Sequence, residues 1–130
     1  MTASVTTTGA ISGIGQIAIN VHDLERATAF YRDRLGLKLL FLVPPKMTFF
    51  DCGGVRLMLA TPEKPEFDHA ASILYYRVGD LQQAHAELAA RGVTFEEPPH
   101  LVAKMPDHEL WMASLRDSEN NLLALMCEVR

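Results

Sequence analysis

Alternation of apolar and polar positions is the first regular pattern along the chain. It occurs in residues 12–21, where Ile17, Ile19 and Val21 form one face and Gln16, Ala18 and Asn20 form the other. An extended segment with one strongly apolar face is typical of a strand that covers a core on one side. The pattern therefore predicts a strand over residues 12–21.

Helical periodicity replaces the alternation after Asp23. The apolar residues that recur at helical spacing are Leu24, Ala27, Phe30, Tyr31 and Leu35. Asp23 can accept a hydrogen bond from a free first-turn N–H, and Gly36 suits the left-handed position after a helix. We predict one helix from Leu24 to Leu35, with its apolar stripe in the core.

Three further strands are predicted before the middle of the chain. Residues 37–43 are apolar and extended, and Pro44-Pro45 stops them. Residues 47–52 and 55–60 flank Gly53-Gly54, and two glycines between apolar runs predict a tight hairpin. The first half is therefore expected to be a β-α-β-β-β module.

The second half repeats this plan. Four pairs of residues share an offset of about 57 positions: Val21 and Val78, Asp23 and Asp80, Leu24 and Leu81, Ala27 and Ala84. The predicted elements are a strand over 72–78, a helix with the stripe Leu81, Ala84 and Leu88 that ends at Gly92, a short strand over 93–96, a break at Pro98-Pro99, strands over 100–105 and 108–116, a turn over 117–121, and a strand over 122–129. Two copies indicate a duplicated unit.

One domain over residues 12–130 accommodates both modules. Module one covers 12–61, a linker covers 62–71 and module two covers 72–129. The linker has two prolines, four charges and no periodicity, so we expect it to connect the modules and to act as a lid. Residues 1–11 lack the features of a secretion signal and are expected to be a flexible tail.

Composition narrows the classes of partner. The 130-residue chain is 48% hydrophobic and 22% charged, which is globular. A net charge of −4 argues against nucleic acid or an anionic membrane surface, and no apolar run reaches bilayer length. Cys52 and Cys127 form no zinc or CxxC spacing, so we expect buried, reduced thiols in a cytoplasmic protein.

Five short motifs carry a family resemblance. They lie at residues 17–24, 29–37, 51–54, 78–81 and 115–122. In this order and spacing they resemble the vicinal oxygen chelate superfamily, which includes glyoxalase I, bleomycin-resistance proteins and extradiol dioxygenases. The resemblance covers residues 12–128. It implies an α+β fold in which two βαβββ modules form a cupped eight-stranded mixed sheet, and a homodimer.

The resemblance also implies a divalent metal held by four strand positions. Carried over one at a time, these fall on Gln16, Met58, Ile73 and Ala124. The amide oxygen of Gln16 is a suitable hard ligand, but a thioether and two hydrocarbon side chains are not. We therefore predict that the usual metal is absent, and we predict no other cofactor.

Strand alternation gives the side chains expected on the concave face. They are Gln16, Ala18, Asn20, Arg56, Met58, Ile73, Tyr75, Arg77, His108, Leu110, Met112, Ser114, Leu122, Ala124 and Met126. This apolar, methionine-rich cup suits a small molecule. Arg56, Tyr75 and Arg77 suit an anionic or aromatic ligand, unless the arginines pair with surface acids. Trp111 is expected in the core, although a register change of one residue would place it in the cup.

Two histidines flank the predicted hairpin between residues 105 and 108. His100 and His108 are expected to face one another, with Asp107 and Glu109 close in sequence. A histidine beside a carboxylate can act as a general base or form a relocated metal site. The alternative is two solvated histidines near a turn. His22, His69 and His85 have no partner that the sequence identifies.

Two functions remain open. The first is a metal-free binding protein whose cup holds a small hydrophobic or aromatic molecule, as in the bleomycin-resistance branch. The second is a lyase or isomerase of glyoxalase type that acts through His108, Tyr75, Arg77 or Gln16 without the usual metal. A dioxygenase needs two histidines and a carboxylate around iron, which the carried-over positions do not supply.

Overall fold

Both halves of the chain have the predicted β-α-β-β-β order in the computed structural model, which describes residues 9–70 and 72–130. Module one contains β1 (Gln16–Asn20), α1 (Leu24–Ala29), a π-helical turn (Phe30–Arg34), β2 (Lys38–Val43), β3 (Met47–Cys52) and β4 (Val55–Ala60). A 3₁₀ turn (Pro65–Phe67) follows in the linker. Module two contains β5 (Leu74–Arg77), α2 (Leu81–Ala90), β6 (Phe95–Lys104), β7 (Glu109–Arg116) and β8 (Leu122–Val129).

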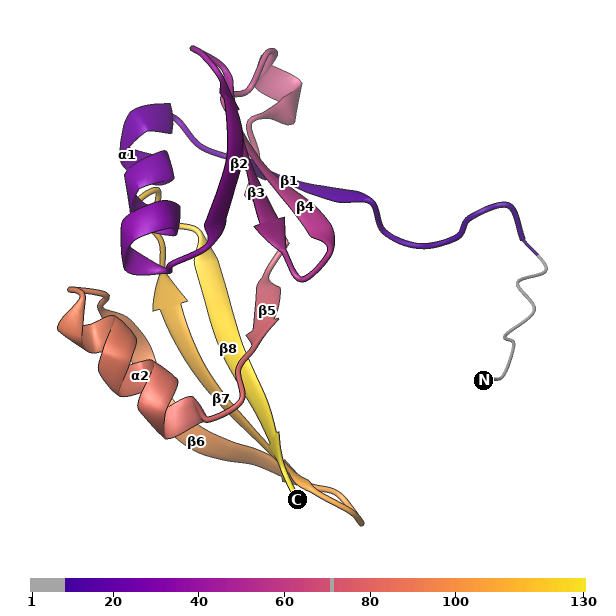
Figure 1. Ribbon diagram of the computed structural model, residues 1–130, viewed down its shortest axis with the longest axis vertical. Coiled ribbons are helices and arrows are strands. Elements are labelled where there is room, and N and C mark those ends of the chain that lie inside the picture. The colour runs from indigo at the N-terminus through magenta and orange to yellow at the C-terminus, as the bar shows by residue number, and fades with distance from the viewer. Residues whose placement is uncertain (1–8, 71) are drawn as a thin grey trace.

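The strands form two mixed sheets with equivalent topology. Their orders are β1-β4-β3-β2 and β5-β8-β7-β6. β1 runs parallel to β4, and β5 runs parallel to β8. All other neighbouring strands are antiparallel. Figure 1 shows α1 and α2 on the same side of their sheets. The α+β prediction is confirmed, with the refinement that the eight strands divide into two hydrogen-bonded sheets of four.

One core joins the two modules on the side of the sheets that carries the helices. The buried cluster combines Ile19, Tyr31 and Leu57 of module one with Leu115 and Leu123 of module two. In this cluster the strand residues Ile19, Leu57 and Leu115 alternate with more exposed residues of the opposite face, as expected for a sheet covered on one side. Trp111 packs against this cluster, so its predicted core position is confirmed.

The first helix departs from the prediction. The α-helical part ends at Ala29, and the chain continues as a π-helical turn in which Leu35 N–H donates to the carbonyl of Phe30 at 3.0 Å. The extra residue in this turn changes the direction of the side chains that follow. Tyr31 lies fully buried in this turn.

The second departure is β6. The sequence predicted a break at Pro98-Pro99, but a single strand runs from Phe95 to Lys104 through both prolines. Its pairing with β7 is irregular between Glu97 and His100. Because β6 is an edge strand, prolines without N–H groups are tolerated there.

The ends of the predicted segments also shift. β1 begins at Gln16, and residues 9–15 form exposed coil. β5 begins at Leu74. The predictions for residues 1–8 and for Ala71 lie outside the described residues. In the described part of the chain, no helix has the length and apolar content needed to cross a bilayer.

Candidate functional site

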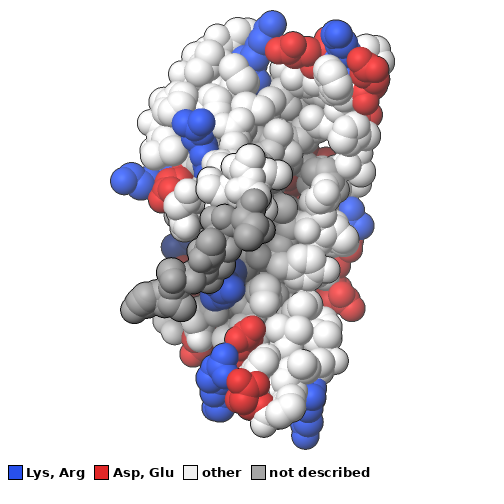
Figure 2. Space-filling view, turned by 90° about the vertical axis from the view of Figure 1, so that its right-hand side faces the viewer, with Lys and Arg blue, Asp and Glu red and all other residues white. Residues whose placement is uncertain are grey.

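The face of the sheets opposite the helices is largely uncharged. Figure 2 looks onto this side of the molecule, and white side chains cover much of it between groups of charged ones. Its apolar residues include Ile73 and Tyr75, which are both exposed. An exposed apolar surface on a folded domain is a candidate binding surface.

The polar groups of this face in module one are bonded to one another. Arg56 Nε donates to Gln16 Oε1 at 2.9 Å, and Gln16 Nε2 lies 3.6 Å from the sulfur of Met58. The Arg56 guanidinium also lies over the ring of Phe49, at 5.4 Å from its centroid. Adjacent strand positions produce this cluster, because β1 pairs with β4 so that Gln16 lies beside Arg56.

This cluster does not fit the metal that the family resemblance implies. The only hard donor among the four carried-over positions is the amide oxygen of Gln16, and that oxygen already accepts a hydrogen bond from a guanidinium. A divalent cation would face this positive charge and would find a thioether at Met58 and hydrocarbon at Ile73 and Ala124. The donor chemistry and the local charge both oppose a metal ion here.

Asn20 has a different role from the predicted one. Its side-chain amide donates to the backbone carbonyls of Phe67 and His69, the latter at 2.9 Å. These hydrogen bonds hold the linker against the end of β1. His22 adds a contact to the same segment, with Nε2 at 2.7 Å from Asp68. Asn20 therefore holds the linker, and its amide hydrogens are unavailable to a ligand.

Module two has a cavity of about 330 Å³ on its open face. It brings together four predicted ligand-binding residues, which are Ile73, Tyr75, Met112 and Ala124. Four polar side chains that were not assigned to the site join them: Glu96, Glu97, His100 and Ser114. Ser114, expected on the concave face, has its hydroxyl 3.2 Å from Glu97 Oε1. The cavity therefore combines apolar side chains with four polar ones, three of which come from β6.

His100 is the histidine of this cavity. Its Nδ1 lies 2.8 Å from the carbonyl oxygen of Pro98. A carbonyl oxygen can only accept, so Nδ1 carries the hydrogen and Nε2 of the neutral ring has a free lone pair. The sequence did not place His100 here because Pro98-Pro99 concealed the register of β6, in which His100 pairs with Met112.

His108 lies elsewhere. Its Nδ1 is 2.7 Å from Asp107 and its Nε2 is 3.9 Å from Glu128, and Arg130 binds Asp107 at 2.8 Å. Hydrogen bonds from His108 and Arg130 lower the pKa of the Asp107 carboxyl. The prediction that His100 and His108 face one another is wrong. In the pairing of β6 with β7, the residue opposite His100 is Met112, and the pairing ends where Lys104 lies opposite Glu109. Among the described residues, no three His, Cys, Asp or Glu side chains form a metal-binding group.

A larger cavity, of about 580 Å³, lies between the two modules. Arg77 borders it, and Tyr75 borders both this cavity and that of module two. β5 is an edge strand, so side chains from both of its faces can reach the space beside it. The alternative to ligand binding was that Arg77 pairs with an acidic residue at the surface. Arg77 forms no ion pair with residues 9–70 or 72–130.

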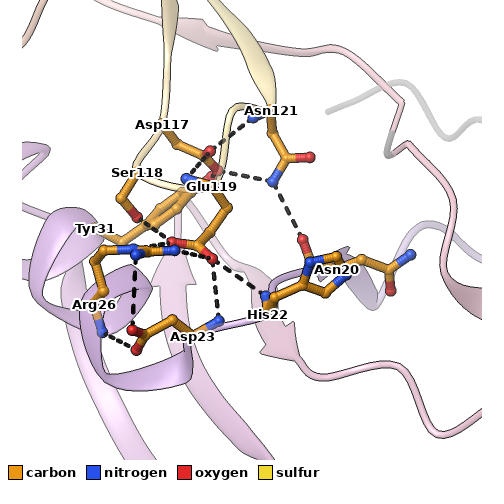
Figure 3. A network of polar contacts seen from close by, with 9 residues as sticks. All are labelled: Asn20, His22, Asp23, Arg26, Tyr31, Asp117, Ser118, Glu119 and Asn121. Carbon is orange, nitrogen blue, oxygen red and sulfur yellow. Dashed lines mark hydrogen bonds and ion pairs between the residues drawn. The ribbon is translucent and has the colours of Figure 1, made fainter.

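A polar network fixes the modules relative to each other (Figure 3). Glu119, in the turn between β7 and β8, accepts hydrogen bonds from the backbone N–H groups of His22 and Asp23 and from Arg26 Nε at 2.7 Å. A carboxylate from the other module thus holds the residues that precede α1, while Asp23 caps the helix by accepting the N–H of Arg26. The family motif at residues 115–122 marked this turn, but no sequence signal indicated its partner.

Comparisons with known proteins agree with this geometry. A family model described as Glyoxalase/Bleomycin resistance protein/Dioxygenase superfamily matches residues 13–125. "Uncharacterized protein YraH" of Bacillus subtilis (strain 168) is 27% identical in an alignment 126 residues long, which covers 85% of this chain and 94% of that protein. A solved structure described as lactoylglutathione lyase from Agrobacterium tumefaciens has a TM-score of 0.73 at 22% identity, covering 92% of this chain and 96% of its own. An integron cassette protein of V. cholerae has a TM-score of 0.75 at 20% identity, covering 93% and 98%.

Proposed function

The chain belongs to the glyoxalase/bleomycin resistance protein/dioxygenase superfamily, and from this premise we propose that it binds a small hydrophobic or aromatic molecule without a metal ion or other cofactor. The binding site is the cavity of module two. The observation that carries the proposal is His100, which borders this cavity together with Ile73 and Met112 and whose Nδ1 hydrogen is held by the carbonyl of Pro98. A site of this kind favours an aromatic body with one hydrogen-bond donor, such as a phenol.

Two copies of the chain make up the proposed assembly. Four consecutive residues of the edge strand β2, Leu40 to Val43, are exposed although all are apolar. A monomer seldom leaves such an edge uncovered, because it invites pairing with another chain. A second copy on this edge would remove these side chains from water. The unpaired thiols of Cys52 and Cys127 suit a reducing compartment, and we place the protein in the cytoplasm.

The second candidate function is a lyase or isomerase that moves a proton without metal. His100 favours it, because a neutral imidazole with one nitrogen held by a carbonyl presents the other as a base. His100 replaces His108 as the base in this scheme. Tyr75 borders the same cavity and is available to bind substrate.

Binding is tested by calorimetric titration with 4-ethylphenol and with 4-ethylanisole, which has no donor hydrogen. We expect 4-ethylphenol to bind more tightly, and His100→Leu to remove the difference. Met112→Trp, which fills the cavity, should abolish binding of both. Equal affinities in the wild type, or affinities unchanged by Met112→Trp, would overturn the proposal.

Catalysis is tested with the hemithioacetal of methylglyoxal and glutathione, in the presence of a chelator. Turnover that disappears in His100→Ala and persists in His108→Ala would favour the enzyme. Phenol binding with no turnover would favour the binding protein. The two functions are thus separated by measurements on the same variants.

A further inference from the structure

The cavity between the modules is a second candidate binding site, on the core side of the sheets. Leu35 and Leu57 border it from module one, and Leu74, Leu88 and Leu125 border it from module two. Its volume of about 580 Å³ is within the range of small-molecule sites. It differs in position and lining from the module-two cavity, in which Met112, His100 and Ser114 lie.

Charge distinguishes this cavity from an ordinary gap in a core. Two charged side chains border it, Glu87 and Arg77. Glu87 is neutralised by Arg91, at 3.3 Å one helical turn further along α2. Arg77 is exposed and has no hydrogen-bond or ion-pair partner among the residues that the structure describes. Arg77 is therefore a charged residue that borders an apolar space and has no partner in the described part of the chain.

We propose that this intermodule cavity binds an amphipathic carboxylic acid, with the apolar chain between the modules and the carboxylate on Arg77. A guanidinium binds a carboxylate through two parallel hydrogen bonds, and the hydroxyl of the neighbouring Tyr75 can supply a third. The leucines remove the chain of the acid from water. This site shares Tyr75 and Leu123 with the phenol site proposed above, but its other lining residues are different.

The chemistry favours a carboxylate over a phosphate ester. One guanidinium neutralises a single negative charge, and a phosphate ester with two charges would leave one uncompensated beside an apolar space. An apolar molecule without a charge would fill the same space but would gain nothing from Arg77. The head group is therefore the feature that the experiment must vary.

Decanoate and 1-decanol are suitable probes, because they share a chain length and differ in charge. We expect calorimetric titration of the full chain to show decanoate binding about tenfold more tightly than 1-decanol. In Arg77→Met the affinity for decanoate should fall to that for 1-decanol. Arg56→Met is the matched control, since Arg56 is bonded to Gln16 on the open face, and it should leave decanoate binding unchanged.

The position of the probe is checked by methyl NMR. Decanoate should shift the signals of Leu88 and Val78, which border the intermodule cavity, and leave Met112 unchanged. Ala84→Phe, which places a ring in the cavity, should block binding, and circular dichroism confirms that this variant is folded. Equal binding of acid and alcohol, or decanoate binding that survives Arg77→Met, would overturn the proposal. Shifts confined to Met112 would also overturn it. None of these outcomes decides whether 4-ethylphenol binds in the module-two cavity.

Discussion

The hydroxyl of Tyr31 donates a 2.7 Å hydrogen bond to Oδ2 of Asp117, and both residues are buried. Tyr31 belongs to the π-helical turn of module one, and Asp117 to the turn between β7 and β8 of module two. Asp117 Oδ1 also accepts the backbone N–H groups of Glu119 and Asn121, each at 2.8 Å. Burial and the nearby carboxylate of Asp117 raise the pKa of Tyr31. This buried bond connects the two modules.

Tyr31→Phe should destabilise the fold by about 1–3 kcal/mol, because it removes a donor from a buried carboxylate. The matched control is Tyr76→Phe. The Tyr76 hydroxyl is buried with no hydrogen-bond partner in the described part of the chain, so its loss should be neutral or stabilising. Urea unfolding followed by the fluorescence of Trp111 measures both. Equal losses of stability would show that the Tyr31 bond contributes nothing specific.

Acid should weaken the contact between the modules at Glu119. Burial opposes ionisation, but hydrogen bonds from Arg26 and from Asp23 N–H outweigh it and lower the pKa of Glu119 from 4.5 to about 2. The ionised carboxylate therefore stabilises the fold above pH 4.5, and this stability is lost as the pH falls through about 2. The side chain is only 4% exposed, so little of the effect is screened.

Glu119→Gln should lower stability at pH 7 by roughly 1–3 kcal/mol and flatten the pH dependence in that window. Thermal unfolding at a series of pH values measures this. Glu66→Gln, in the exposed linker, is the control and should leave the profile unchanged. A wild-type profile already flat between these pH values would contradict the prediction.

Asn20→Ala should release the linker. The substitution removes the two hydrogen bonds to the carbonyls of Phe67 and His69. Chymotrypsin should then cut after Phe67 about tenfold faster, because cleavage follows the population of the open segment. His22→Ala removes only the exposed contact to Asp68 and should have a smaller effect. A cleavage rate unchanged in Asn20→Ala would show that the linker is held by other contacts.

Divalent metal should not bind at the family position. Protein without an affinity tag, incubated with excess Ni²⁺ or Zn²⁺ and then desalted, should retain well below one ion per chain, and its unfolding temperature should not rise. The reason is that the guanidinium of Arg56 donates a hydrogen bond to the amide oxygen of Gln16, so its positive charge lies where the metal would bind. Elemental analysis gives the metal content. One ion per chain that disappears in Gln16→Ala would refute the prediction.

Phe41→Lys should convert the proposed dimer to a monomer. Phe41 is 45% exposed on β2 and stacks on Phe49 with ring centroids 4.5 Å apart. A charge in a covered apolar surface is unfavourable unless it is paired. Sedimentation velocity measures the change. Lys38→Met, on the same strand, is the control and should leave the dimer intact, while a wild-type monomer would exclude the proposed assembly.

The sequence alone determined the order of the elements and the fold class. Alternation around Ile17 and Ile19, and the common offset between Asp23 and Asp80, depend on neighbours a few residues apart or on repetition of such a pattern. The side chains that face the core could be predicted for the same reason. Ile19, Leu57 and Leu123 are buried as the alternation requires.

Only the tertiary structure decided which polar groups meet. His100 entered the module-two cavity because β6 continues through two prolines on a sheet edge, and local propensity opposes that outcome. Glu119 reaches α1 across 96 positions to Asp23 N–H, and Arg77 faces a cavity that exists only between two modules. Periodicity reports the face on which a side chain lies, whereas its partners depend on how whole modules pack.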